Sequence, residues 1–168
     1  MFKCLFIKAL GFRHVLRFIF LKIKVMEVFN KIFLVDDDKF TLNLYHRVVE
    51  ESIYSEIELF SSGEDCLGSL DKNPTIIFLD YHMGELNGFE VLKKIKANNP
   101  NIFVVMVSSQ DDLKVAVNSL KNGAFDYIIK GKEEITRMKN VLFRIQELQS
   151  IMKEPKSHFF QKMFSFLL

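Results

Sequence analysis

The stretch 75-TIIFLD-80 is an unbroken apolar run that ends in a carboxylate at Asp80. A run this short, rich in β-branched residues and bounded by turn residues, predicts a strand covered on both faces, as parallel sheets require. Three further runs have the same form: KIFLV (31–35) before Asp36, IFVVMV (102–107) before Ser108, and FDYIIK (125–130), which ends in Lys130. Because the carboxyl ends of parallel strands meet at one edge of a sheet, we expect these polar side chains to lie together.

Helical patterns separate the strands. Helices are predicted over 40–51, from Ser62 to about Leu70, over 89–98, from Asp111 to about Asn122, and from about Lys132 onward; IELF (57–60) predicts a further short strand. Five strand–helix units predict an α/β fold: a doubly wound, five-stranded parallel sheet with helices on both faces. The last helix carries one apolar stripe, predicted as core in its first half and as a homodimer seam past Leu148: Ile135, Met138, Leu142, Ile145, Leu148 and Met152.

Charge is unevenly distributed. Residues 1–25 hold six basic side chains and no acid, and residues 155–168 hold two more, so residues 26–154 carry 15 basic and 21 acidic side chains. A net charge of −6 in this central part argues against nucleic acid as a partner. The two cysteines, Cys4 and Cys66, have neither metal-site spacing nor a disulfide framework, which favours a cytoplasmic location.

The two ends differ from the central domain, which we place at residues 26–154. Residues 1–25 form a basic, apolar extension whose charges break every long apolar run, so neither a spanning helix nor a signal peptide is predicted. Three interpretations stay open: translation starts at Met26, the extension is an arm that binds a membrane surface or a partner, or it is a helix packed on the domain. Its cations do not share one helical face, which argues against membrane contact. Residues 155–168 form a short apolar tail, and no output domain is expected.

The polar residues at the strand ends suit one chemistry. Mg²⁺ prefers oxygen ligands in octahedral geometry and is held by one or two carboxylates together with phosphate oxygens. Asp36 and Asp37 can reach one ion from the end of a strand, and Asp80 can offer one oxygen to the ion and the other as a nucleophile. Lys130 can offset charge on phosphoryl oxygens, and Ser108 can donate a hydrogen bond to them. The sequence therefore predicts a magnesium-dependent phosphoryl-transfer site.

Four motifs, spread over residues 31–131, resemble the receiver domain of two-component response regulators, which has a flavodoxin-like fold. They are VDDDKF (35–40), LDYHMGELNGFEVL (79–92), VMVSSQ (105–110) and GAFDYIIKG (123–131). The resemblance implies that Asp36 and Asp37 are the acidic metal pair and that Asp80 is the phosphoacceptor. It also implies a metal-ligand role for the backbone carbonyl of His82, and the family's lysine role for Lys130.

The resemblance further implies a mechanism. A sensor histidine kinase or a histidine phosphotransfer protein would pass its phosphoryl group to Asp80. Ser108 would then move toward that group and Tyr127 would turn inward, which alters the face formed by the fourth helix, the fifth strand and the fifth helix. Output would follow by contact with a downstream protein that the sequence does not name. The chain would be a phosphoacceptor in a signalling pathway or phosphorelay rather than a classical enzyme.

Two positions depart from the family pattern, and two alternatives remain. Gly131 follows Lys130 and Gly84 follows Met83, where the family commonly has proline. A dehalogenase-like phosphatase also uses an Asp nucleophile and Mg²⁺, but its signature needs Thr or Val where this chain has Phe40. The other alternative, kept open by Gly131, is an inactive receiver that serves only as a binding module.

Overall fold

The computed structural model of this chain describes residues 31–52, 54, 56–84, 86–109 and 113–153. These residues form a parallel sheet of five strands in the order β2-β1-β3-β4-β5. The strands are β1 (Lys31–Val35), β2 (Glu56–Phe60), β3 (Ile76–Asp80), β4 (Phe103–Ser108) and β5 (Asp126–Ile129). The predicted sheet is confirmed, whereas the predictions for residues 1–25 and 155–168 lie outside the described residues.

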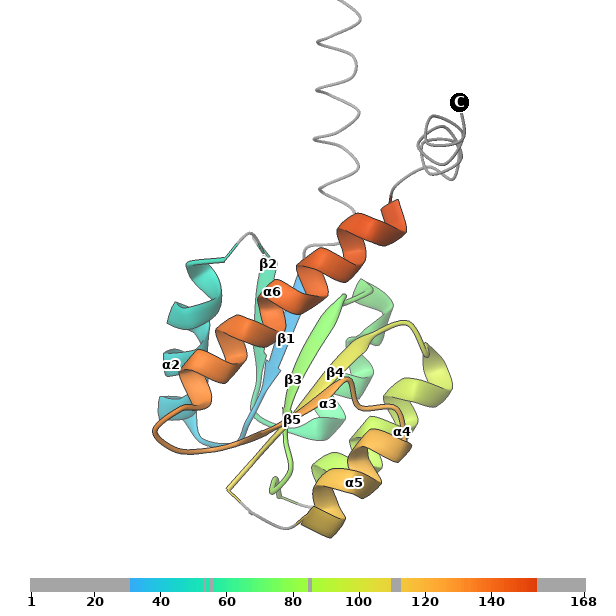
Figure 1. The fold of residues 1–168 in the computed structure, drawn as a ribbon. Helices are drawn as coiled ribbons and strands as arrows, with labels where there is room; N and C mark the ends of the chain where they lie inside the picture. Colours follow the sequence, from blue (N-terminus) through green and yellow to red (C-terminus); the bar gives the residue numbers. More distant parts are fainter. Residues whose placement is uncertain (1–30, 53, 55, 85, 110–112, 154–168) are drawn as a thin grey trace, which may run out of the picture.

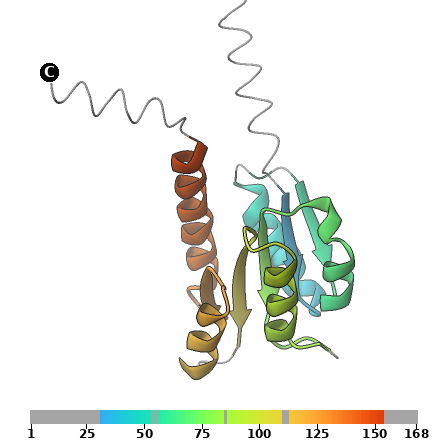
Figure 2. The ribbon, with the colours of Figure 1, turned by 90° about the vertical axis from the view of Figure 1, so that its right-hand side faces the viewer.

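The helices cover both faces of the sheet. Helices α2 and α6 lie on one face, and α3, α4 and α5 lie on the other (Figures 1 and 2). Their bounds are α2 (Lys39–Glu50), α3 (Gly63–Gly68), α4 (Gly88–Asn98), α5 (Leu113–Lys121) and α6 (Glu134–Lys153), and a short 3-10 helix covers Leu70–Lys72. The doubly wound α/β fold is therefore confirmed. The chain passes from β1 outward to β2 and then crosses to β3, so the strand order reverses beside β1, where ligands bind in folds of this kind.

The strands explain why the core has two halves. Residues Ile32 and Leu34 of β1 face α2 and α6, whereas Phe33 and Val35 face α3 and α4. All five residues of β3 are buried, as expected for a central strand with helices on both sides. Since both faces of the sheet are apolar, polar groups of the central strands are displaced to the strand ends.

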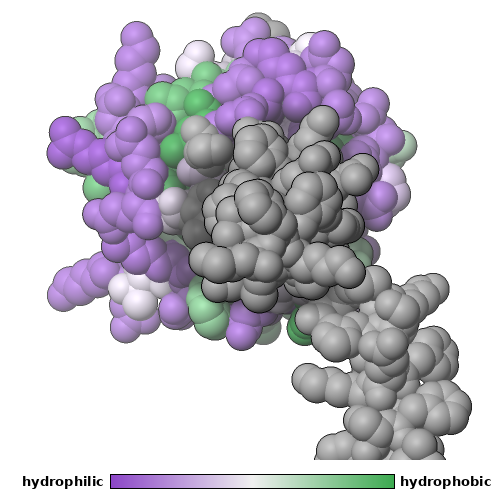
Figure 3. Space-filling model, turned by 90° about the horizontal axis from the view of Figure 1, so that it is seen from above, coloured by the Kyte–Doolittle hydropathy of each residue, from purple (hydrophilic) through white to green (hydrophobic). Residues whose placement is uncertain are grey.

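Helix α6 contributes to the core only along its first part. Met138, Leu142 and Ile145 are buried, but Leu148 is 40% exposed and Met152 is 78% exposed. The predicted core role of the first half is thus confirmed, and the dimer seam past Leu148 stays a prediction. Seen from above, the surface of the described residues is mostly hydrophilic (Figure 3). Among the described residues, no helix combines the length and the apolar character needed to cross a bilayer.

Gly88 sets how closely α4 approaches the strand that carries Asp80. Its N–H donates to the carbonyl oxygen of Tyr81 at 2.9 Å. A Cβ atom at Gly88 would collide with the carbonyl oxygen of Asp80 and would lie 2.9 Å from the Tyr81 Cα atom. Only glycine therefore lets the first turn of α4 pack directly under the end of β3.

We expect Gly88→Ala to lower the free energy of unfolding by at least about 2 kcal/mol, because backbone atoms must move to accept the methyl group. Chemical denaturation at equilibrium measures the change. Gly68→Ala is the matched control, because Gly68 also lies at a helix end and its added Cβ would meet no atom within 4 Å. Similar stability of the two variants would contradict this account of Gly88.

Candidate functional site

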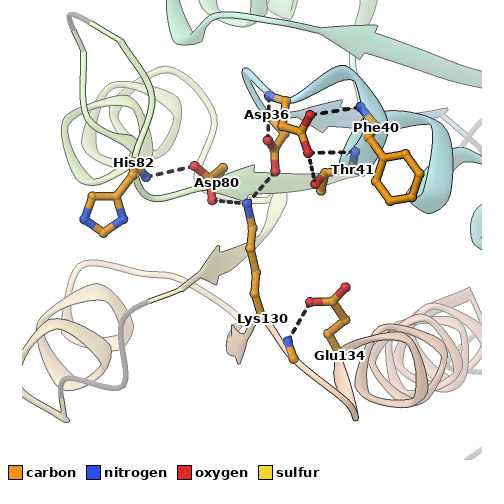
Figure 4. Close-up of polar contacts among 9 residues, drawn as sticks. Asp36, Phe40, Thr41, Asp80, His82, Lys130 and Glu134 are labelled. Atoms are coloured by element: carbon orange, nitrogen blue, oxygen red, sulfur yellow. Dashed lines mark hydrogen bonds and ion pairs between the residues drawn. The ribbon is translucent and has the colours of Figure 1, made fainter.

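The carboxyl ends of β1, β3 and β5 bring the predicted charged residues together. Asp36 directly follows β1, Asp80 is the last residue of β3, and Lys130 directly follows β5. The Lys130 Nζ atom lies 2.8 Å from Asp36 Oδ2 and 2.8 Å from Asp80 Oδ1 (Figure 4). Residues separated by almost a hundred positions thus form one cluster at the reversal of strand order.

Burial makes this cluster electrostatically demanding. The side chains of Asp36 and Asp80 are 2% and 4% exposed, and that of Lys130 is 25% exposed. Two carboxylates withdrawn from water and placed next to each other need a nearby cation. The Lys130 ammonium supplies that charge to both at once.

The pKa values of these groups follow from the same arrangement. Burial raises the pKa of Asp80 above its ordinary value, and the charge of Asp36 adds to the rise, while Lys130 and the His82 N–H oppose it. For Lys130, burial lowers the pKa, but the hydrogen bonds to Asp36 and Asp80 and the negative charges of both together outweigh it, so the net shift is upward. The upward shift keeps Lys130 charged, whereas the upward shift of Asp80 shows that one lysine does not fully offset its burial next to Asp36.

Asp37 completes a group that could hold a cation. One carboxylate oxygen from each of Asp36, Asp37 and Asp80 lies within 4.8 Å of the others. Asp37 is exposed, whereas the other two are buried, so the group opens toward solvent. An all-oxygen, anionic donor set suits a hard cation such as Mg²⁺ and lacks the thiolate and imidazole ligands typical of zinc sites. These residues therefore fit the predicted metal.

Asp38, the third consecutive aspartate, has a structural role that the sequence analysis did not assign. It caps α2: its carboxylate accepts hydrogen bonds from the Phe40 and Thr41 N–H groups at 3.1 and 3.2 Å and from the Thr41 hydroxyl at 2.7 Å. The spacing of Asp38 and Thr41 at a helix start is a capping signal in the sequence. A dehalogenase-like phosphatase would need this second aspartate for chemistry, and here it is used to start the helix.

His82 follows Asp80 by two residues. Its N–H donates to Asp80 Oδ2 at 2.9 Å, so each oxygen of Asp80 is engaged, one by Lys130 and one by the backbone. These two contacts hold the carboxylate of Asp80 from both of its oxygens. The metal-ligand role of the His82 carbonyl stays a prediction.

Ser108 and Tyr127 belong to β4 and β5, the two strands that lie beyond β3 on the side away from β1. Ser108 is buried as the last residue of β4, which pairs with β3 so that Asp80 stands opposite the preceding residue, Val107. Tyr127 is 9% exposed in the middle of β5 and belongs to the core cluster on the side of α3, α4 and α5. Ser108 thus lies at the same sheet edge as the acidic cluster, whereas Tyr127 lies inside β5, before that edge. The movements predicted for both residues remain predictions.

The segment after Lys130 replaces the family's proline by glycine. The described residues contain no cis peptide bond, and Gly131 has φ +152°, in the region that favours glycine. Its N–H donates to Glu134 Oε2 at 2.8 Å (Figure 4). No role was predicted for Glu134 from the sequence, although a Gly-x-x-Glu spacing at a helix start resembles half of a capping box. Gly84, the second departure, is exposed.

Comparison with known proteins agrees with this geometry. Residues 32–141 match the family described as the response regulator receiver domain. The chain belongs to this family. The chemotaxis protein CheY of Listeria monocytogenes is 31% identical over 101 residues, which cover 60% of this chain and 85% of that protein. The transcriptional regulatory protein ZraR of Salmonella typhimurium is 34% identical over 100 residues, but the match covers only 22% of its length.

Solved receiver structures share the fold. A CheY-like receiver domain protein from Methanospirillum hungatei superposes with a TM-score of 0.64 at 24% identity, covering 73% of this chain and 98% of that chain. The receiver domain of a putative LuxO repressor protein from Vibrio parahaemolyticus gives 0.66 at 23% identity, covering 76% of this chain and all of that chain. At these identities the structures establish the receiver fold alone.

Removal of the positive charge of Lys130 tests the electrostatics of this receiver domain. We expect Lys130→Met, without Mg²⁺, to lower the free energy of unfolding near neutral pH by about 3 kcal/mol, because two close carboxylates then stay buried without a counter-charge. The loss should shrink as the pH falls, since burial raises the pKa of Asp80, so that without its counter-charge this carboxyl group becomes neutral in the folded state before it does so in the unfolded state.

Denaturation of both proteins at neutral and acid pH measures this difference. Lys132→Met is the control, because Lys132 is exposed and its substitution removes the same charge from the same loop. A loss for Lys130→Met that is independent of pH would mean that packing of the lysine stem, and not its charge, stabilises the cluster.

Proposed function

We propose that this receiver domain is a phosphorylation-dependent switch of two-component signalling, with Asp80 as the phosphoacceptor and Mg²⁺ as its cofactor. The observation that carries the proposal is the convergence of Asp36, Asp37, Asp80 and Lys130 at one edge of the sheet. The phosphoryl group would come from the phosphohistidine of a sensor kinase or of a phosphotransfer protein. The chain is then a substrate that is modified once per signal, and not an enzyme with turnover.

The transfer needs a nucleophile and charge neutralisation. An oxygen of Asp80 attacks phosphorus, the phosphorus–nitrogen bond of the donor breaks, and the electron pair leaves with the imidazole. Asp36, Asp37 and Asp80 would hold Mg²⁺, which when bound supplies positive charge to the phosphoryl oxygens. The Lys130 Nζ atom lies 2.8 Å from Asp80 Oδ1, so it is placed to offset negative charge on the phosphoryl group once that group is bonded to Asp80.

The output would be a change in a surface. Ser108 would donate a hydrogen bond to the phosphoryl group, and its movement with that of Tyr127 would alter the face formed by α5, β5 and α6. Three apolar side chains of α5 are exposed to solvent: Leu113, Val117 and Leu120. An exposed apolar stripe of this kind supports protein contact as the route of output. The partner is a protein of unknown identity.

The first test is covalent labelling by a small phosphodonor. With acetyl phosphate and Mg²⁺, we expect the intact mass of the protein to rise by one phosphoryl group, and Asp80→Asn to abolish the increase because an amide oxygen is a poor nucleophile. Asp71→Asn is the control, since Asp71 is an exposed acid in the 3-10 helix before β3 and so is not at the carboxyl ends of the strands. Labelling of Asp80→Asn at the wild-type level would refute the acceptor assignment.

The second test concerns the metal and uses neighbouring aspartates. At a Mg²⁺ concentration ten times the dissociation constant, the free energy of unfolding of the wild type should rise by about 1.4 kcal/mol. We expect Asp37→Asn to lose most of this stabilisation. Asp38→Asn should retain it, because Asp38 is occupied by the α2 cap and asparagine is an equally good capping residue. Thermal unfolding with and without Mg²⁺ distinguishes them, and equal responses of the two variants would contradict the predicted ligand set.

A further inference from the structure

Both peptide groups that flank the Lys130 Cα atom are hydrogen-bonded. The N–H of Lys130 donates to the carbonyl oxygen of Ser108 at 2.8 Å. The next N–H along the chain, that of Gly131, donates to Glu134 Oε2 at 2.8 Å (Figure 4). Because the two flanking peptide planes determine the direction of the Cα–Cβ bond, these contacts fix the point from which the lysine side chain departs.

Glu134 makes two hydrogen bonds to Gly131, the residue after Lys130. Its side chain accepts from the Gly131 N–H, and its own N–H donates to the Gly131 carbonyl oxygen at 3.1 Å. Glu134 is the first residue of α6, where a carboxylate is favoured by the helix dipole. Helix α6 is in turn held on the sheet by buried residues such as Met138 and Leu142. The segment is therefore tied to a rigid element.

This arrangement depends on glycine. A proline at position 131 has no N–H to donate and requires a φ near −65°, whereas Gly131 has φ +152°. Glycine alone would leave the backbone after Lys130 with many accessible conformations. The Glu134 side chain offsets that freedom by selecting one of them.

We propose that Glu134 is a positioning residue for Lys130: through the Gly131 N–H it holds the lysine amino group between Asp36 and Asp80, and thus on the path of the phosphoryl group. The consequence for phosphorylation rests on the proposed function, whereas the consequence for the lysine does not. The adjacent Glu133 provides a comparison, because it is exposed and its side chain makes no hydrogen bond to any other described residue.

The rate of labelling by acetyl phosphate tests the functional half. We expect Glu134→Ala to be slower by about tenfold, because the amino group is no longer held in place. Glu134→Gln retains an oxygen acceptor and should recover to within about twofold of wild type. Glu133→Ala removes the same charge from the same helix end and should be unchanged. Wild-type rates in Glu134→Ala, or equal losses in the alanine and glutamine variants, would overturn the proposal.

Nuclear magnetic resonance of the unphosphorylated protein tests the other half independently. In wild type and Glu134→Gln, the Gly131 amide should exchange slowly with solvent, and the two Lys130 Cε protons should have distinct shifts because the side chain is held. In Glu134→Ala, the amide should exchange fast and the two shifts should merge. Distinct Cε proton shifts in a folded Glu134→Ala variant would overturn the positioning role, even if neither the wild type nor the variants accept a phosphoryl group. If the spectra are as expected but the wild type is not labelled, the result would instead count against Asp80 as the acceptor.

Discussion

One lysine between two buried carboxylates is the interaction on which this molecule depends. Asp36 and Asp80 come from adjacent central strands and would repel each other in the dry edge of the sheet, so the fold is compatible with them only when Lys130 reaches across from β5. The need for positive charge at this edge of the sheet also suits it to a bound cation. The same carboxylates, together with Asp37, concentrate negative charge in a group that could hold a divalent cation.

Much of the fold was predictable from the sequence because burial leaves a clear pattern. Fully apolar runs such as 75–79 identify central strands, and the polar residue that ends each run identifies the edge where ligands bind. The convergence of Asp36, Asp80 and Lys130 then follows from parallel topology alone. Resemblance to a known family added roles to these residues, but their proximity needed only the order of strands and helices.

Other features depend on contacts that a one-dimensional pattern does not contain. Three consecutive aspartates look equivalent in sequence, yet Asp36 is buried against Lys130, Asp37 faces solvent and Asp38 caps a helix. Their roles diverge because the chain turns from strand to helix within three residues, which points each side chain in a different direction. Glu134 was missed for a related reason: its significance lies in the N–H that glycine leaves available, and the sequence shows the glycine without showing its partner.

The course of α6 has a practical consequence for anyone who attaches something to this protein. The helix begins beside Lys130 and its 20 residues span about 30 Å, so its last turn emerges at the pole remote from the acidic edge (Figure 1). A fluorescent reporter or an affinity handle attached to the last turn of α6 would therefore sit far from the cluster of Asp36, Asp80 and Lys130.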